Sequence, residues 1–484
     1  MASLKKNLFY SFFLSFSQVL LPFITIPYIS RVLDPEGVGR AGFIDSFAYY
    51  FVAIAEFGIT VYGTREVVKC LNDKTALRRL VSELVVLHLI SSAITMVLYA
   101  IAVFFVWHKI NDIRLLLFSV SFLLVNAFAC EWYFMGTERF RYITIRSLVT
   151  RLLGLAAVFV LIKQPSDFYL YYAIMVAAAC ANLIWNMFSL FREVPLQLKG
   201  IDWKRHIKYT WVTYIISVLY SATIMLDNVL VGLASTAAAV AFYSFTVKIV
   251  RVSGVLLSDS LQVFFPKMVA LLKEEKTEQV QGLLLRNVQF IIFFSVPLCM
   301  GVFLLSDELV AAYLGKSFSG VAFNLKIVAA FPFIKLFSLF ITRQVLVAGH
   351  NEKLSVISLT TGVVTLLIAM PLLSFYFASP GGCIAIMLTE LVILAMNCYF
   401  ARKVNAGLRI FDVAAFLKAC IAVLVFIPVV FVLRKYTGGL VFLASAFTGC
   451  FVSYILVQLF VLRTSFALYL NTTILQYLFK RKLQ

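Results

Sequence analysis

The sequence predicts an all-α polytopic membrane protein with about fourteen transmembrane helices. Apolar residues make up 62% of the 484 residues and charged residues only 13%, a balance that would not keep a soluble domain of this size dispersed in water. The apolar residues gather into stretches of roughly 20 residues, the length that a helix needs to cross a hydrocarbon core about 30 Å thick. Because no water there can satisfy backbone amides, these stretches must be helical.

The expected spans follow one another along nearly the whole chain, with short loops between them. The segment 192–208 is one of the most polar and basic breaks, and it divides a first set of six helices from a second. After residue 463, apolar residues followed by a Lys-Arg-Lys cluster predict a helix on the anionic cytoplasmic leaflet. We therefore expect an N-terminal six-helix lobe (1–200), a C-terminal six-helix lobe (201–404), helices 13 and 14 (405–463) and a cytoplasmic interfacial tail (464–484). The expected spans are 8–30, 41–63, 80–107, 115–135, 143–163, 169–191, 209–232, 238–264, 288–314, 321–347, 355–378, 381–401, 411–434 and 439–462.

The basic residues set the orientation. Of 42 Lys and Arg residues, 28 fall on one side of the expected spans, 8 on the other and 6 within them. This positive-inside asymmetry places both termini in the cytoplasm. The net charge of +19 does not indicate nucleic-acid binding, because the cations are spread over short segments without aromatic interleaving.

Cofactor and metal motifs are weak. The 8 cysteines are scattered, with no C-x-x-C and no histidine at ligand spacing, so neither a disulfide framework nor a metal site is indicated. The segment 37–42 matches the G-x-G-x-x-G string, but no strand precedes it, and we interpret its glycines as loop residues between two membrane helices. We expect no cofactor, no metal and no enzyme activity.

Three cations lie deep in the expected spans: Lys248, Arg251 and Lys335. An ionised side chain at the bilayer centre costs ~2.5–3.5 kcal/mol, so each retained charge is a functional candidate. Lys248 and Arg251 are three residues apart and share one helix face. They either bind an anion or pair with the acids Asp227 and Asp259, and the sequence leaves both readings open.

The carboxylates Glu56 and Glu390 lie nearest the middle of their spans and, with Asp227, are the candidates for proton or sodium coupling. Internal ion pairing is an equally open reading. Arg31 and Arg65 lie at span ends, where the default role is anchoring. Prolines also fall within three spans, and broken helices line cavities or hinges in membrane bundles. They are Pro22, Pro27, Pro297 and Pro332.

Several segments resemble a known family. The runs 24–33 (ITIPYISRVL), 36–39 (EGVG) and 57–66 (FGITVYGTRE), with 131–140 (EWYFMGTERF) and 226–232 (LDNVLVG), are similar to bacterial O-antigen and capsule flippases of Wzx type. These proteins belong to the multidrug/oligosaccharidyl-lipid/polysaccharide exporter superfamily. The resemblance extends over at least the first twelve helices.

The resemblance implies two six-helix bundles in a V around a central cavity, working by alternating access in the bacterial inner membrane. It implies that an undecaprenyl-diphosphate-linked oligosaccharide is moved from the cytoplasmic to the periplasmic leaflet, with a polysaccharide polymerase as a further partner. In related flippases, cations on the first, second and eighth helices meet the diphosphate. By position these are Arg31, Arg65, Lys248 and Arg251.

Two other functions stay open. A drug or cation antiporter of the same superfamily would usually have twelve spans and an acid-lined cavity. A membrane glycosyltransferase or polysaccharide ligase would need a large outside loop or a catalytic carboxylate at the outer face, and no expected outside loop exceeds about a dozen residues.

Overall fold

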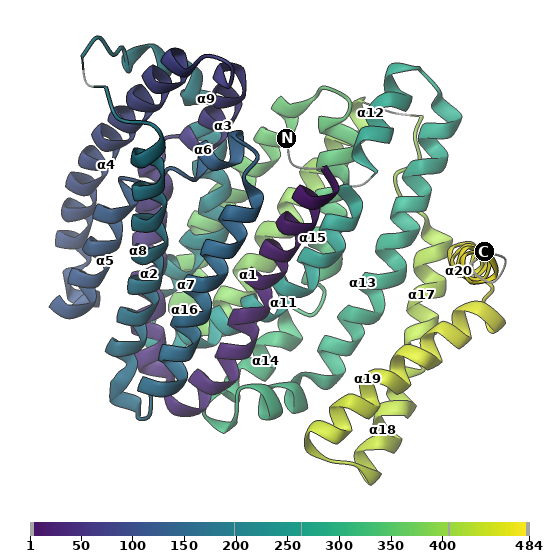
Figure 1. Cartoon of the computed structure of the whole chain (residues 1–484). Coiled ribbons are helices and arrows are strands. Elements are labelled where there is room, and N and C mark those ends of the chain that lie inside the picture. The colour runs from purple at the N-terminus through teal and green to yellow at the C-terminus, as the bar shows by residue number, and fades with distance from the viewer. Residues whose placement is uncertain (1–3, 198, 263, 405–406, 481–484) are drawn as a thin grey trace. The chain divides into compact units, whose positions relative to one another are not determined.

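The computed structural model describes residues 4–197, 199–262, 264–404 and 407–480. Within these ranges the regular structure is helical, as the sequence predicts (Figure 1). The chain forms two compact units, Met1–Ala241 and Phe242–Gln484. We call them the N-terminal unit and the C-terminal unit.

The N-terminal unit is a helical bundle in which three helices begin at an aspartate cap. Side chains of Asp34, Asp73 and Asp112 accept hydrogen bonds from the first turns of α2, α4 and α5. A 3-10 turn (Pro165–Asp167) precedes α8, and a π-helical segment, Ala222–Leu226, joins α9 to α10. The helices are α1 (Leu4–Val32), α2 (Pro35–Ala55), α3 (Ile59–Cys70), α4 (Lys74–Ile110), α5 (Ile113–Asn126), α6 (Glu131–Gly136), α7 (Phe140–Leu161), α8 (Phe168–Glu193), α9 (Lys204–Ser221) and α10 (Asp227–Ala234).

The C-terminal unit contains the longest helices of the chain. α11 begins just before the unit boundary, a 3-10 turn (Lys316–Phe318) precedes α14, and two π-helical segments, Ile341–Val347 and Val457–Val461, follow α15 and α19. The helices are α11 (Ala237–Gln262), α12 (Phe265–Lys273), α13 (Thr277–Tyr313), α14 (Gly320–Ile327), α15 (Phe331–Phe340), α16 (Glu352–Val404), α17 (Val413–Val423), α18 (Phe426–Tyr436), α19 (Gly439–Leu456) and α20 (Ser465–Lys480).

Helix α16 is a hairpin of two antiparallel passes. Ala378 has non-helical backbone angles, φ 50° and ψ −130°. A Cβ atom on Gly381 would lie 1.9 Å from the carbonyl oxygen of Leu373. Eight residues of straight helix would separate these positions by about 12 Å, so the chain must turn back between them. α16 therefore matches the two expected spans 355–378 and 381–401.

The multi-pass membrane fold is confirmed. Ten of the described helices are long and apolar enough to cross a membrane, or up to twelve if each of two bent helix pairs is one span. α16 is counted as one candidate span although it turns back on itself. α11, which corresponds to the expected span 238–264, is not among the candidate spans. The number fourteen stays a prediction.

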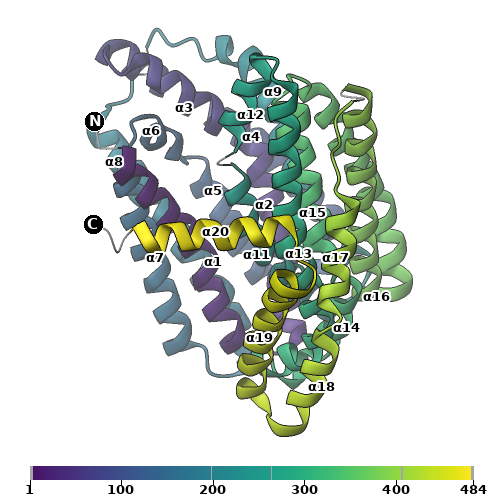
Figure 2. The ribbon, with the colours of Figure 1, turned by 90° about the vertical axis from the view of Figure 1, so that its right-hand side faces the viewer.

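Helices α17 to α20 pack on α13. Phe293 of α13 contacts the rings of Tyr454 and Phe466, and the Tyr454 hydroxyl donates to the Phe293 carbonyl oxygen at 3.0 Å. The Arg286 guanidinium lies 3.8 Å from the centre of the Tyr469 ring. Figure 2 shows α20 running crosswise to α13. α20 falls within the expected tail 464–484, whose place at the cytoplasmic leaflet stays a prediction.

The glycine string does not form a loop, so that interpretation is wrong. Gly37 and Gly39 lie in the first turns of α2, which begins at Pro35 after the Asp34 cap. A Cβ atom on Gly39 would lie 1.7 Å from the carbonyl oxygen of Ala237, so glycine here permits a close backbone approach.

The prolines interrupt fewer helices than expected. α1 runs through Pro22 and Pro27, and α13 runs through Pro297, without a break in the helix. Pro332 does mark an interruption, because it is the second residue of α15 and follows the bend between α14 and α15.

Along the chain, the boundary between the compact units follows Ala241, whereas the sequence suggests a boundary near residue 200. Helices α9 and α10 group with the N-terminal unit because they pack on α2 and α3. The division of the chain into functional lobes stays a prediction.

Candidate functional site

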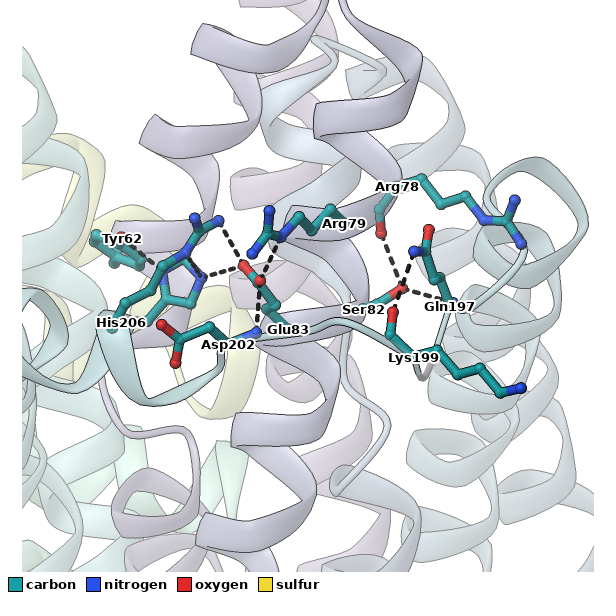
Figure 3. A network of polar contacts seen from close by, with 10 residues as sticks. Tyr62, Arg78, Arg79, Ser82, Glu83, Gln197, Lys199, Asp202 and His206 are labelled. Atoms are coloured by element: carbon teal, nitrogen blue, oxygen red, sulfur yellow. Dashed lines mark hydrogen bonds and ion pairs between the residues drawn. The ribbon is translucent and has the colours of Figure 1, made fainter.

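A polar network surrounds the buried side chain of Glu83 near the start of α4 (Figure 3). Its carboxylate accepts hydrogen bonds from Arg79 Nε at 2.9 Å, Arg205 Nη2 at 2.6 Å and the backbone N–H of Asp202 at 2.8 Å. His206 Nε2 lies 2.9 Å from the same carboxylate. α4, the segment before α9 and α9 itself thus meet at one buried charge.

The network continues on both sides of Glu83. His206 Nδ1 lies 2.8 Å from the Tyr62 hydroxyl of α3. The Ser82 hydroxyl accepts a hydrogen bond from the backbone N–H of Gln197 at 2.9 Å, and Arg78 Nε donates to the carbonyl oxygen of Pro195 at 2.8 Å. These contacts hold Pro195, Gln197 and Asp202, which precede α9, against α4, so we interpret the network as an anchor for the start of α9.

Lys248 and Arg251 lie on α11, where helical spacing brings both to one face, as expected. Lys248 is exposed and Arg251 half-buried. The Lys248 ammonium lies 5.8 Å from the centre of the Phe245 ring. The side chain of Asp259, one of the acids considered as a partner, lies outside the described residues.

Lys335 and Glu390 form an ion pair inside the C-terminal unit. Lys335 Nζ of α15 lies 2.7 Å from Glu390 Oε1 of α16, and the Glu390 side chain is 2% exposed. The structure therefore brings together a substrate-binding candidate and an ion-coupling candidate. This is the internal pairing that the sequence leaves open, and the two proposed roles remain untested.

Arg31 and Arg65 both present exposed side chains. Arg31 lies in the last turn of α1 and donates from Nη1 to the carbonyl oxygen of Pro27 at 2.8 Å. Arg65 lies on α3, with Nε 3.2 Å from Glu66 Oε1 and its guanidinium 5.5 Å from the centre of the Tyr62 ring. Their positions fit surface anchors as well as cations that receive a substrate.

Asp227 is fully buried at the first residue of α10, directly after the π-helical segment. Its carboxylate accepts a hydrogen bond from the backbone N–H of Asn228 at 2.8 Å.

Glu56 ends α2 and lines a cavity of about 370 Å³ inside the N-terminal unit. The Thr60 hydroxyl lies 3.5 Å from Glu56 Oε2. His88, Asn126 and Glu131 line the same cavity. Asp227 and Glu390, the other two coupling candidates, do not line this cavity.

Sequence reasoning did not find the role of Arg146. It counts this arginine with the cytoplasmic cations, but the structure buries it in α7 with 1% exposure. Its Nη2 atom lies 3.6 Å from Glu131 Oε1. Sequence reasoning also missed the Glu83 network. The sequence offered two signals for it: a glutamate, Glu83, within the expected span 80–107, and a histidine, His206, within the basic segment 192–208.

Known proteins provide independent comparisons. Residues 4–272 match the family model described as "Polysaccharide biosynthesis protein". A "Putative O-antigen transporter" of Escherichia coli (strain K12) is 23% identical over 420 residues, covering 83% of this chain and 97% of the relative. Another protein with that description, from Shigella dysenteriae, is 24% identical over 400 residues, covering 81% and 98%.

Solved structures share the fold. The structure titled "Lipid II flippase MurJ, inward closed conformation" superposes with a TM-score of 0.64 at 12% identity, covering 94% of this chain and 98% of that one. An inward-facing multidrug resistance MATE family transporter of the MOP superfamily gives a TM-score of 0.60 at 14% identity, covering 80% and 95%. These likenesses show the fold alone. The family model matches more than half of the residues of this chain, so the chain belongs to the polysaccharide biosynthesis protein family.

Proposed function

We propose that this protein is a flippase that moves undecaprenyl-diphosphate-linked oligosaccharide repeat units across the bacterial inner membrane by alternating access. Membership of the polysaccharide biosynthesis family, relatives described as O-antigen transporters and the fold of a lipid II flippase support this proposal. The observation that carries it is the pair Lys248 and Arg251, two cations on one face of α11.

The chemistry of these two cations suits a diphosphate. A guanidinium presents a planar fork of donors that binds phosphate oxygens in a bidentate manner, whereas an ammonium supplies a compact point charge. Phosphate charge would offset the cost of holding Lys248 and Arg251 at mid-span, and their charge would lower the cost of moving the headgroup. The prenyl tail stays in lipid. Arg31 and Arg65 of the N-terminal unit, with Lys335, complete the proposed substrate-binding set.

Orientation and coupling belong to the same proposal. The distribution of Lys and Arg supports cytoplasmic termini. Glu56, Asp227 and Glu390 are the proposed acids for proton or sodium coupling. A polysaccharide polymerase that consumes the translocated repeat unit is the proposed partner, with no nucleic acid involved.

The alternatives have less support. The curated relatives carry a polysaccharide description rather than a drug description, which disfavours the antiporter. Connections between the described helices are short, and they include no folded domain of the kind that a glycosyltransferase or ligase needs outside the membrane. We therefore propose a transporter without enzyme activity.

The test is a complementation assay in a bacterium whose own flippase gene is deleted. We expect the double variant Lys248→Ala, Arg251→Ala to lose surface polysaccharide while its membrane abundance stays normal. A matched control is Lys267→Ala, Lys273→Ala, which removes two exposed cations from α12 of the same unit and should export normally. Full export by the α11 variant would remove these residues from the mechanism.

A further inference from the structure

The cavity in the N-terminal unit has the size of a site for one small ligand. Its volume of about 370 Å³ lies near the lower end of the range of roughly 300–1,000 Å³ that small-molecule sites occupy. Residues beside three helix interruptions line it: the bend of 40° between α2 and α3, the break between α5 and α6, and the π-helical segment that joins α9 to α10. Membrane proteins tolerate broken helices where these line a cavity, so the interruptions fit a binding site.

The polar side chains of the wall include hydrogen-bond donors as well as acceptors. Trp132 and Asn126 line the cavity and are 2% and 5% exposed, and Trp132 Nε1 and Asn126 Nδ2 have no hydrogen-bond partner in the described structure. Both of these nitrogen atoms can only donate. Asn182 Oδ1, an acceptor, and His88 Nε2 also lack a partner within the part of the chain that the structure describes. A ligand that matches this wall must therefore both accept and donate hydrogen bonds.

Two carboxylates add acceptors to the wall, and no basic side chain faces them across the cavity. Glu56 and Glu131 line the cavity, and the Glu131 side chain is 36% exposed. Arg146 Nη2 lies 3.6 Å from Glu131 Oε1, but Arg146 is 1% exposed and does not line the cavity. Among the described lining residues there is no lysine or arginine. An acidic ligand would therefore find carboxylates on this wall without a lysine or arginine to pair with.

Aromatic rings form another part of the wall. Tyr49 of α2 and Phe122 of α5 line the cavity with their ring centroids 4.8 Å apart, and Trp132 of α6 lines it as well. The face of an aromatic ring carries partial negative charge. It attracts the weakly positive C–H bonds on the apolar face of a sugar ring, while the hydroxyl groups at the edge of that ring stay free to form hydrogen bonds.

We propose that this cavity binds one uncharged sugar ring of the oligosaccharide headgroup and discriminates against acidic sugars. Each hydroxyl group of a sugar both donates and accepts, so one ring can serve the donors of Trp132 and Asn126 together with the acceptors of Glu56 and Glu131. A metal ion or an organic cation would leave the indole and amide donors unpaired, which is unfavourable for buried groups. The carboxylate of an acidic sugar would lose its hydration without gaining a cation.

A sugar site supplies a selectivity that the diphosphate cannot. Lys248 and Arg251 are proposed to bind the diphosphate, which all substrates linked to the same lipid carrier share. Specificity is a difference of affinities, so discrimination between repeat units requires contacts with the sugars themselves. The assignment of the bound ring to the transported repeat unit rests on the flippase function proposed above, whereas binding of an uncharged sugar does not.

Sugar binding is tested on the purified full chain in lipid nanodiscs by saturation-transfer difference NMR, which detects weakly bound ligands. The probes are glucose, galactose and mannose, each paired with its uronate, which differs by a carboxylate at C6. We expect at least one uncharged sugar to bind, and its uronate to bind at least about tenfold more weakly. Absence of binding by all three uncharged sugars overturns the proposal. Equal affinities of a bound sugar and its uronate overturn the discrimination.

Two variants place the bound sugar in this cavity, each with a matched control. Ala179→Leu adds bulk at the cavity wall and should abolish binding, whereas Ala177→Leu changes an exposed residue of the same helix outside the cavity lining and should bind as wild type. Trp132→Phe keeps an aromatic ring but removes the N–H donor, so the affinity should fall about 3- to 10-fold. Trp185→Phe, at an exposed tryptophan of α8, should leave the affinity unchanged. Wild-type affinity in Ala179→Leu or Trp132→Phe contradicts the site.

The outcome is separable from that of the flippase proposal. The probes are free sugars without a lipid or a diphosphate, and the variant Lys248→Ala, Arg251→Ala should bind them as wild type does. Sugar binding together with normal export by that α11 variant would overturn the diphosphate site and leave the sugar site standing. Absence of sugar binding together with lost export in the α11 variant would do the reverse.

Discussion

Replacing Glu83 by glutamine should detach the start of α9 from α4. The side chain keeps its size but loses its charge, and one amide oxygen replaces two carboxylate oxygens. Glu83 is fully buried and has partners on Arg79, Arg205, His206 and the backbone of Asp202. A single amide oxygen accepts at most two hydrogen bonds, so about two of these donors lose their acceptor.

The size of the free-energy loss depends on how exposed the side chains that contact Glu83 are. Arg79 and Arg205 have side chains that are 47% and 45% exposed, so water replaces much of what they lose. His206 is 4% exposed, and a buried donor without an acceptor costs about 1–3 kcal/mol. We expect Glu83→Gln to lower the free energy of local opening by about 2–4 kcal/mol, which raises the open population about 30- to 700-fold.

Limited trypsin digestion measures this opening at the bonds after Lys204 and Arg205, in the first turn of α9. When opening and closing are faster than cleavage, the cleavage rate follows the open population. Glu36→Gln is the control, because Glu36 and Arg40 form an exposed pair worth under about 1 kcal/mol. A cleavage rate for Glu83→Gln within threefold of wild type would refute this reasoning.

Two further predictions concern the C-terminal unit. Lys335→Met leaves Glu390 buried without its cation and should cost about 3–5 kcal/mol of stability, whereas adding Glu390→Gln should recover part of this loss. Thermal unfolding of the two single variants and the double variant gives the coupling free energy between the two residues. Additive effects of the two single substitutions would argue against the ion pair. Gly381→Ala forces a Cβ to within 1.9 Å of the Leu373 carbonyl oxygen, so we expect the α16 hairpin to misfold and membrane abundance to fall. Gly301→Ala meets no atom within 4 Å and should accumulate normally.

Apolar run length was enough to predict the fold class and most spans, because the bilayer demands about 20 apolar residues per helix. The start of α2 was also readable, since Asp34 followed by Pro35 is a strong helix-start signal, yet the glycines after it were taken for a loop. The break between α2 and α3 was not visible. It depends on packing: a Cβ on Gly58 would lie 2.6 Å from the Thr213 hydroxyl oxygen of α9.

For the candidate site, the sequence identified charges but not their partners. Lys335 and Glu390 each stood out as a charge in an apolar span, but their pairing joins residues 55 apart and requires the tertiary fold. Arg146 was counted by its place near the end of a span, while its burial depends on the helices that cover it. The cavity beside Glu131 arises from three interrupted helices, and apolar periodicity carries no signal for such a convergence.

The most direct test of the central claim is binding of undecaprenyl diphosphate to the purified chain in nanodiscs, measured by native mass spectrometry at fixed salt. Wild type and the Lys267→Ala, Lys273→Ala control should bind alike. The Lys248→Ala, Arg251→Ala variant should bind at least about a hundredfold more weakly, because two charge-assisted contacts of about 1.5–3 kcal/mol each are removed. Equal affinity for all three proteins would contradict a cationic diphosphate site on α11.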